Sequence, residues 1–356
     1  MEAYIAQRVR DIVECNPWLL GSLIKKSTGL DLTYSIGNIS LEYEKRQTFS
    51  ITNDSQLDET SDYETISSRM KRLAMNIKVI NKKDIPYCVV LIRMSSQKFA
   101  ILFSLNHIIG DGQTSYQLYG MLNEKSKPRS LIAERISGFT KAKDDIMGKE
   151  NSFNASAFLG FIIKVILKSV FCTMHKVEIH SVDQVAIEKL KLEHKQSTDH
   201  QESFISTDDI LQSWLLCQMR CDIGFVSLNF RNRIPGVTAD HAGNYSDSFK
   251  LQKHDFDSPF KIRESIKSHP RIEIPLPDSS MKAAQKKYSF MSSWVSDYED
   301  VQLSDCNQIY HVPFVEPQSA LSSSVIYRPR KGEIRVLTMS KLKMFSKPMV
   351  IPSIKN

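Results

Sequence analysis

Apolar residues at the start of the chain recur at the spacing of an α-helix. Ile5, Val9 and Ile12 fall on one face, and Val13 lies beside them. A period of this kind is typical of a helix whose apolar side packs on a core. Pro17 lacks a backbone amide to donate, so we expect the helix to end just before it.

Strands are predicted where apolar and β-branched residues run together between polar turns. Residues 86–94 are rich in Val, Ile and Leu, and residues 99–105 form a second apolar run. The polar residues 95–98 join the two runs, which predicts a β-hairpin. The same reasoning predicts short strands at 41–43 and 48–52, an amphipathic helix at 66–77 and a helix at 113–122.

The second half of the chain also mixes helical and strand patterns. Ser206 lies three residues before Asp209, a capping pair that predicts the start of a helix. Three prolines within residues 270–287 indicate a loop. Strands are predicted at 223–230, 320–327 and 333–339. Helices interspersed with strands favour an α/β fold.

One segment is apolar enough to require a membrane test. Residues 155–174 approach the length that spans a bilayer, but Lys164 and Lys168 lie near the centre, one helical turn apart. A single central charge costs about 3 kcal/mol on insertion. Gly160 and Ser156 extend the lysine stripe along the same face. Three alternatives stay open, namely a helix packed on the protein, a helix lying on a membrane surface, and a membrane span; the lysines favour the first two.

Length and polarity together predict the domain organisation. At about 150 residues per domain, a chain of 356 residues predicts two domains. Residues 124–153 are polar, as a surface connection would be, and residues 189–204 are charged. We therefore expect an N-terminal domain at 1–150, a crossover segment containing the apolar helix at 151–204, and a C-terminal domain at 205–356.

Composition excludes some classes of partner and site. The net charge of +7 is a mild excess, and no basic block carries interleaved aromatic residues, so we expect no nucleic-acid partner. The six cysteines are scattered. Cys217 and Cys221 lie one helical turn apart, but no second pair completes a metal site, so no metal is expected. Scattered thiols favour a reducing compartment, which points to the cytoplasm.

The strongest chemical signal is an H-x-x-x-D-G motif formed by His107, Asp111 and Gly112. It lies between the predicted strand at 99–105 and the predicted helix at 113–122. A histidine at a strand end, followed by an aspartate and a glycine at a turn, can be held in one orientation, which a general base requires. Two plainer alternatives stay open: His107 as a hydrogen-bonded structural residue, and Asp111 as the cap of the next helix.

Five further stretches accompany the motif in a fixed order along the chain. They are residues 16–23, 206–214, 228–235, 242–244 and 292–294. The stretch 228–235 contains the pattern N-x-R-x-R. In order and spacing the series resembles the BAHD acyltransferases. These belong to the superfamily of CoA-dependent acyltransferases, which includes chloramphenicol acetyltransferase and condensation domains.

The resemblance implies a fold of two chloramphenicol-acetyltransferase-like domains, each a mixed sheet flanked by helices, with a channel between them. It implies that His107 is the general base for acyl transfer from an acyl-CoA thioester to a hydroxyl or amine acceptor. Asp111 would form a structural ion pair with an arginine, and the N-x-R-x-R pattern favours Arg231 over Arg233. Gly112 would permit the tight turn into the helix.

The resemblance also implies that Ser292 and Trp294 donate hydrogen bonds to the oxyanion or to the substrate. Acyl-CoA is then a cosubstrate, and no cofactor is bound. A small-molecule acceptor points to a role in secondary metabolism. The protein is expected to be a monomer.

Two departures from the family pattern support other hypotheses. The family carries a strand before its first helix, which this sequence lacks, and whether the amino terminus is truncated or mis-started stays open. Within residues 305–310 only Asp305 matches the family's D-F-G-W-G motif. The alternatives are an inactive relative that binds a ligand or serves as a scaffold, and a membrane-surface synthase of lipid or wax esters that uses residues 155–174 as its foot.

Overall fold

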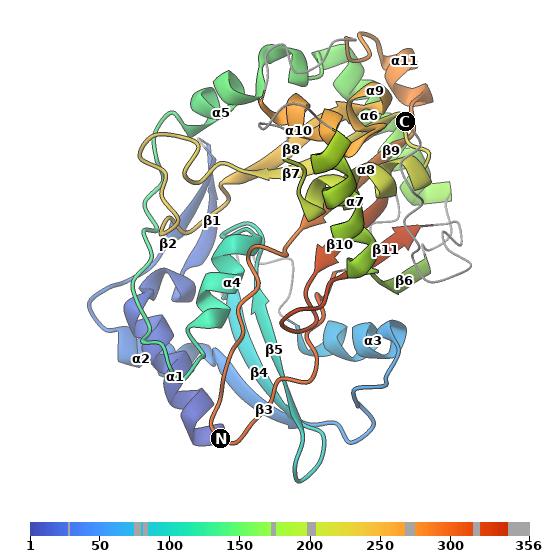
Figure 1. Cartoon of the computed structure of the whole chain (residues 1–356). Helices are drawn as coiled ribbons and strands as arrows, with labels where there is room; N and C mark the ends of the chain where they lie inside the picture. The colour runs from blue at the N-terminus through green and yellow to red at the C-terminus, as the bar shows by residue number, and fades with distance from the viewer. Residues whose placement is uncertain are drawn as a thin grey trace. The chain divides into compact units, whose positions relative to one another are not determined.

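The computed structural model describes residues 1–27, 29–74, 80, 85–171, 176–197, 204–267, 275–315 and 321–340. The chain forms two compact units, each built from three segments (Figure 1). The first unit comprises Met1–Ser137, Arg231–Tyr245 and Asp297–Phe314, and the second comprises Gly138–Phe230, Ser246–Ser296 and Val315–Asn356. Our sequence analysis expected contiguous domains, whereas these units alternate along the chain.

The first unit contains two small sheets. β3 (Phe49–Asn53) pairs in parallel with β4 (Tyr87–Arg93), and β4 pairs antiparallel with β5 (Phe99–Leu105). The predicted hairpin is thus confirmed. β1 (Ser22–Lys26) and β2 (Gly29–Thr33) form a separate antiparallel pair. The helices of this unit are α1 (Glu2–Cys15), the 3-10 helix η1 (Pro17–Leu20), α2 (Ile39–Arg46), α3 (Tyr63–Leu73) and α4 (Gly112–Gly120).

The apolar face predicted for the first helix forms part of the core of this unit. Ile5, Val9, Ile12 and Val13 are completely buried. They share one cluster with Tyr87 of β4 and with apolar residues of β5 and α4. Each such side chain stabilises the fold by about 1.5–3 kcal/mol when it is fully buried. The core therefore fixes β5 and α4, which flank the H-x-x-x-D-G motif, against α1.

One of the predicted strands is a helix. Residues 41–43, predicted as a strand, lie inside α2. Ile39 and Tyr43, four residues apart, pack against the core, so the period that determines the structure here is helical. A run of three residues is too short to distinguish the two periods.

The second unit is organised around one six-stranded sheet of order β6–β11–β10–β9–β7–β8. β9 runs parallel to both of its neighbours, and the other pairs are antiparallel. The strands are β6 (Lys176–Ser181), β7 (Ile223–Asn229), β8 (Ser246–Gln252), β9 (Tyr288–Ser293), β10 (Ser322–Tyr327) and β11 (Arg335–Ser340). The helices are α5 (Phe139–Met147), η2 (Lys149–Asn151), α6 (Ala155–Phe171), α7 (Gln184–Ser197), α8 (Thr207–Gln218), α9 (Lys253–Phe256), α10 (Pro259–Lys267) and α11 (Ser280–Gln285).

Mixed sheets accompanied by helices confirm the α/β fold class. Ser206 and Asp209 form the predicted capping box at the start of α8. The helix predicted at 66–77 is present as α3, which ends at Leu73, and residues 75–77 lie outside the described part of the chain.

The loop predicted at 270–287 contains a helix. Residues 280–285 form α11, and Pro275 and Pro277 precede this helix, so they do not interrupt it. Residues 270–274, and residues 172–174 at the end of the predicted apolar segment, lie outside the described residues.

α6 presents its predicted lysine stripe to the protein. Gly160 lies so close to α11 that a Cβ there would collide with the backbone of Ser280. Lys164 Nζ donates to the carbonyl of Ala284 at 2.7 Å and also to that of Lys286. The packed alternative is therefore confirmed for this face of α6. Within the described residues, none of the helices combines the length and the apolarity needed to cross a membrane.

Candidate active site

Hydrogen bonds fix the turn between β5 and α4 on both sides of His107. Asn106 Oδ1 accepts from the amide of Ile108 at 3.0 Å, and the amide of Asn106 donates to the carbonyl of Pro86 at 2.8 Å. Asn244 Nδ2 donates to the carbonyl of His107 at 2.6 Å. Because its neighbours and its own carbonyl are held, the backbone that carries the imidazole has little freedom.

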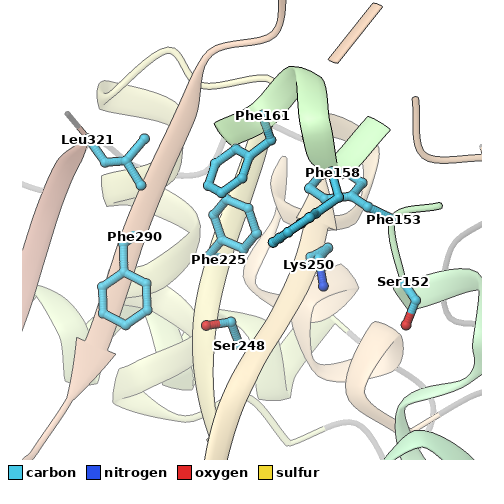
Figure 2. Close-up of a pocket in the computed structure, with 9 residues that line it drawn as sticks. All are labelled: Ser152, Phe153, Phe158, Phe161, Phe225, Ser248, Lys250, Phe290 and Leu321. Carbon is cyan, nitrogen blue, oxygen red and sulfur yellow. The ribbon is translucent and has the colours of Figure 1, made fainter. Parts of the chain in front are cut away.

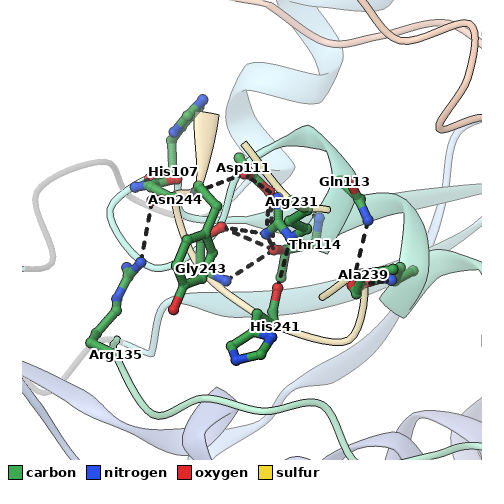
Figure 3. A network of polar contacts seen from close by, with 12 residues as sticks. His107, Asp111, Gln113, Thr114, Arg135, Arg231, Ala239, His241, Gly243 and Asn244 are labelled. Atoms are coloured by element: carbon green, nitrogen blue, oxygen red, sulfur yellow. Dashed lines mark hydrogen bonds and ion pairs between the residues drawn. The ribbon is translucent and has the colours of Figure 1, made fainter. Parts of the chain in front are cut away.

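The imidazole of His107 itself is exposed. It extends away from the polar network formed by the residues around Asp111 (Figure 3). Among the residues that the structure describes, none forms a hydrogen bond with the ring. A ring on a fixed backbone, with its nitrogens open to solvent, can accept a proton from a bound ligand. Within the described residues, the ring of His107 is therefore not held by hydrogen bonds of its own.

Asp111 is buried and paired with an arginine. Arg231 Nη1 lies 2.7 Å from Asp111 Oδ2, and Arg231 Nη2 lies 3.0 Å from Oδ1. The exposed fractions are 1% for the arginine side chain and 3% for the aspartate, so water does not screen this two-point pair. Asp111 also caps α4 by accepting from the amide of Thr114 at 3.1 Å. The helix cap and the ion pair considered from the sequence are therefore both present on one side chain.

The end of β7 explains which arginine forms the pair. β7 ends at Asn229, and residues 231–234 form a turn, so neither arginine lies on the strand. Arg231 is buried, whereas Arg233 is exposed. Arg231 Nε also donates to the carbonyl of His241 at 2.8 Å. The guanidinium is thus bound along both of its edges.

Two opposing effects set the charge of Asp111. Burial raises the pKa of its carboxyl, but the hydrogen bonds and the charge of Arg231, with the amides of Thr114 and Tyr245, hold that pKa below its usual range. The amide of Tyr245 lies 3.0 Å from Asp111 Oδ2. Asp111 is therefore ionised at neutral pH and anchors the turn as a carboxylate.

Thr114 and Gly243, which the sequence analysis did not select as site residues, complete the network. The Thr114 hydroxyl accepts from Arg231 Nη2 and from the amide of Gly243, each at 3.0 Å. Its oxygen lies 3.0 Å from Asp111 Oδ1, to which its own proton can be donated. Gly243 has a φ of 128°, which favours glycine. A Cβ there would also collide with the guanidinium of Arg135.

Weak sequence signals for these residues exist. Thr114 lies three residues after Asp111, where the amide that a capping aspartate binds is expected. Gly243 and Asn244 belong to the stretch 242–244 that accompanies the arginines in the sequence. Neither signal shows that the Thr114 hydroxyl binds an arginine far away in the chain.

The two glycines of the turn differ in what they contribute. Gly112 is the first residue of α4, and its φ is not positive, so the turn needs no left-handed backbone there. At Gly110, in contrast, a Cβ would lie 2.7 Å from Leu105 Cδ2 and 3.0 Å from Thr114 Cγ2. The close packing of the turn against β5 and α4 therefore depends on Gly110.

In the second unit, Ser292 and Trp294 contact each other at the end of β9. The indole Nε1 of Trp294 donates to Ser292 Oγ at 3.0 Å. The Trp294 amide donates to the carbonyl of Ile326 on β10 at 2.8 Å. The indole N–H is thus directed at Ser292 and not at a ligand, whereas the Ser292 hydroxyl keeps its own proton to donate.

A pocket of about 360 Å³ lies in the second unit, between α6 and the strands β7, β8 and β9 (Figure 2). Its walls are mostly aromatic, with Phe158 and Phe161 from α6 and Phe225 from β7. Lys250 of β8 also lines it, and Lys250 Nζ donates to the carbonyl of Asn151 at 2.8 Å. Burial lowers the pKa of Lys250. An apolar or aromatic group suits these walls.

Metal-ligating side chains do not gather in the described part of the chain: no group of three or more His, Cys, Asp or Glu there could hold a metal ion. Cys221 is buried, and Cys217 on α8 is exposed.

No protein-family model matches the chain, and no curated protein matches it. Solved structures nevertheless share its fold. TRI101 of F. graminearum, complexed with coenzyme A and deoxynivalenol, is 12% identical, with 96% of this chain and 88% of that chain covered and a TM-score of 0.59. The epimerization domain from the third module of tyrocidine synthetase B is 11% identical, with 96% and 83% covered and a TM-score of 0.54. The starter condensation domain of rhizomide synthetase RzmA, in complex with C8-CoA, is 10% identical, with 96% and 81% covered and a TM-score of 0.54.

At these identities the similarity establishes the fold. The expected two-domain α/β fold of the chloramphenicol acetyltransferase type is confirmed, because the match extends over most of each chain. Fold alone does not determine chemistry, since an epimerization domain and a condensation domain both share it.

Proposed function

We propose that the protein transfers an acyl group from a CoA thioester to a hydroxyl or amine of a small molecule, with His107 as the general base. The observation that carries this proposal is the state of His107. Its backbone is held by Asn106 and Asn244, while its ring is exposed and forms no hydrogen bond with a described residue. Support also comes from two structures of the same fold that contain CoA or an acyl-CoA.

In this proposal the reaction needs no covalent acyl-enzyme. His107 takes a proton from the acceptor as the acceptor oxygen or nitrogen attacks the thioester carbonyl. The resulting oxyanion collapses, the new ester or amide forms, and the bond to sulfur breaks. The imidazolium then returns its proton to the CoA thiolate, so the histidine ends the cycle unchanged.

The other predicted site residues have supporting roles in the proposal. Asp111 and Arg231 hold the turn, which fixes the position of the base without contact with the substrate. Ser292 is the stronger candidate for an oxyanion donor, because Trp294 donates its indole N–H to Ser292.

The test measures the release of free CoA thiol from acetyl-CoA and from longer acyl-CoAs, with pooled alcohol and amine acceptors. Three proteins are compared: the wild type, His107→Ala and, as a matched control, His194→Ala, which removes an imidazole from α7. General-base catalysis contributes about 10²–10⁴-fold to a rate. We therefore expect acceptor-dependent release to fall at least a hundredfold in His107→Ala and to stay near the wild-type rate in the control.

Acceptor-dependent release that persists in His107→Ala would remove the histidine from the mechanism. Negligible release from both the wild type and the control would favour the alternative of an inactive relative that binds a ligand. The pairing of Ser292 with Trp294 favours this alternative, because it occupies one of the two expected donors.

A further inference from the structure

The side of α6 that faces away from the protein carries an apolar stripe. Leu159, Ile163, Ile166 and Leu167 are 54%, 42%, 56% and 51% exposed, and Phe158 is 53% exposed. Their spacing places them on neighbouring turns of one side of the helix. Met281 of the adjacent α11 is 73% exposed. Soluble monomers rarely leave contiguous apolar side chains of this extent in water without a function for them.

Specific contacts hold α6 with this side outward. Gly160 allows the helix to approach Ser280, and Ser156 Oγ lies 3.1 Å from Ser280 Oγ. Lys164 reaches the carbonyl of Ala284 at the end of α11. Rotating the helix to bury its apolar stripe would break these hydrogen bonds and leave carbonyls of α11 without their donor. The outward orientation is therefore built into the packing.

The surroundings of the stripe are positively charged. Residues 155–171 contain two lysines and no acidic residue. Residues 278–287 contain three lysines and one acidic residue, Asp278, which pairs with Lys282 at 2.9 Å. Both lysines of α6 belong to the stripe that faces the protein. The remaining positive charge lies on Lys286 and Lys287, and the Asp222 carboxylate lies beside them, where it accepts from the Lys287 amide at 2.7 Å. An apolar stripe beside lysines complements a surface that is apolar inside and negatively charged outside, as the leaflet of an anionic membrane is.

We propose that the apolar stripe of α6, with Met281 of α11, docks on the surface of a membrane that contains anionic lipids. The stripe enters the boundary between headgroups and acyl chains, and the neighbouring lysines contact lipid phosphates. Phe158 belongs to the stripe and also lines the aromatic pocket of Figure 2, so the two apolar surfaces meet at this side chain. A pocket beside a docking face suits a flexible acyl chain, which favours a lipid layer over a rigid protein partner.

The test is flotation of the full chain with phosphatidylcholine vesicles, with and without phosphatidylserine. The stripe variant is Ile163→Ser with Leu167→Ser. The matched control is Val185→Ser with Leu192→Ser on α7, where the two side chains are 81% and 55% exposed. We expect the wild type and the control to float with the anionic vesicles, and the stripe variant to bind at least about tenfold more weakly. Unfolding midpoints check that all variants are folded.

A charge variant, Lys286→Gln with Lys287→Gln, tests the electrostatic part separately. Removing a lysine from an anionic surface weakens binding by about fivefold per residue, and added salt should have the same effect on the wild type. The proposal is wrong if the wild type does not float with anionic vesicles, or if the stripe variant floats equally well. A dimer seen by light scattering and lost in the stripe variant would show that the stripe binds a second copy of the chain. Flotation does not measure acyl transfer, so this result and the test of His107 are independent.

Discussion

Two helices, one in each unit, carry an aspartate near their start whose carboxylate binds both another residue at the start of the helix and an arginine. At α4, Asp111 binds Arg231 through both carboxylate oxygens, and both side chains are almost excluded from water. At α8, Asp209 binds Ser206 and Arg263 through a single oxygen, and the arginine side chain is 25% exposed. The residue types are the same and both aspartates are buried, but only at α4 is the arginine buried as well.

This difference teaches that burial, more than the presence of an ion pair, determines what the pair does. A partly exposed pair contributes little, because water solvates the charges well when they are separated. A buried pair leaves an uncompensated charge when one partner is removed. The buried pair is the one in the turn that carries His107, so the position of the imidazole depends on it.

Removal of each arginine tests the comparison most strongly. Arg231→Met leaves Asp111 buried and unpaired, so we expect the free energy of unfolding to fall by about 3–5 kcal/mol. Arg263→Met, the matched change at α8, should cost less, because the Asp209 carboxylate keeps the hydrogen bonds from the Ser206 amide and hydroxyl and because Arg263 is partly exposed. Urea unfolding of both variants measures the two losses, and equal losses would contradict the comparison.

Removing the hydroxyl of Thr114 at the start of α4 should also destabilise the fold more than removing the hydroxyl of Ser206 at the start of α8. Thr114→Val keeps the shape of the side chain but leaves the Gly243 amide without its acceptor and removes one of the acceptors of Arg231 Nη2, at a cost of about 1–3 kcal/mol. Ser206→Ala removes a cap near the surface and should cost about 1 kcal/mol. The midpoints of denaturant unfolding measure the loss of stability in each variant. A larger loss in Ser206→Ala than in Thr114→Val would contradict the prediction.

In acid, Asp111 and Asp208 should change the free energy of unfolding in opposite directions. Asp111 has a lowered pKa, so its stabilisation is complete above the usual aspartate pKa and is lost as the pH falls through its folded value. Burial raises the pKa of Asp208 on α8 despite the hydrogen bond from Ser293, so ionisation of Asp208 opposes folding and acid relieves that cost. Asp111→Asn should therefore flatten the loss of stability in acid, whereas Asp208→Asn should steepen it. Unfolding free energies from neutral pH down to acid check this, and shifts of the same sign would contradict it.

The smallest effect on stability is expected at His107. Its ring is exposed, so His107→Gln should change the unfolding free energy by less than about 0.5 kcal/mol. The same variant should lose acceptor-dependent acyl transfer if the proposed function holds. Thermal unfolding beside the thiol-release assay separates the two readouts, and a large destabilisation would mean that the ring packs in the fold after all.

The sequence predicted the local parts of the site better than the distant ones. His107 and Asp111 belong to one short motif, and the N-x-R-x-R pattern, within the family resemblance, selected Arg231. Tyr245 was not predicted, because it contributes a backbone amide, which nearly every residue type can supply. Thr114 was not predicted either, because the group that its hydroxyl binds is brought near only by folding.

The orientation of α6 shows a second limit. Its amphipathic pattern was visible in the sequence, but the side that faces the protein depends on the partner helix. That partner, α11, was predicted as a loop because of the prolines before it. Without α11, the contacts of Gly160 and Lys164 could not be anticipated, and the apolar side was the natural choice for the core.

The alternation of the two units along the chain has a consequence for biosynthesis. Arg231 is made 120 residues after Asp111, and at about 5–20 residues per second roughly 6–24 s pass between them on the ribosome. The first unit also awaits Asp297–Phe314, and the sheet of the second unit awaits β10 and β11. Both cores thus close only after these late segments have left the ribosome, and until then the nascent chain exposes apolar surface that chaperones bind.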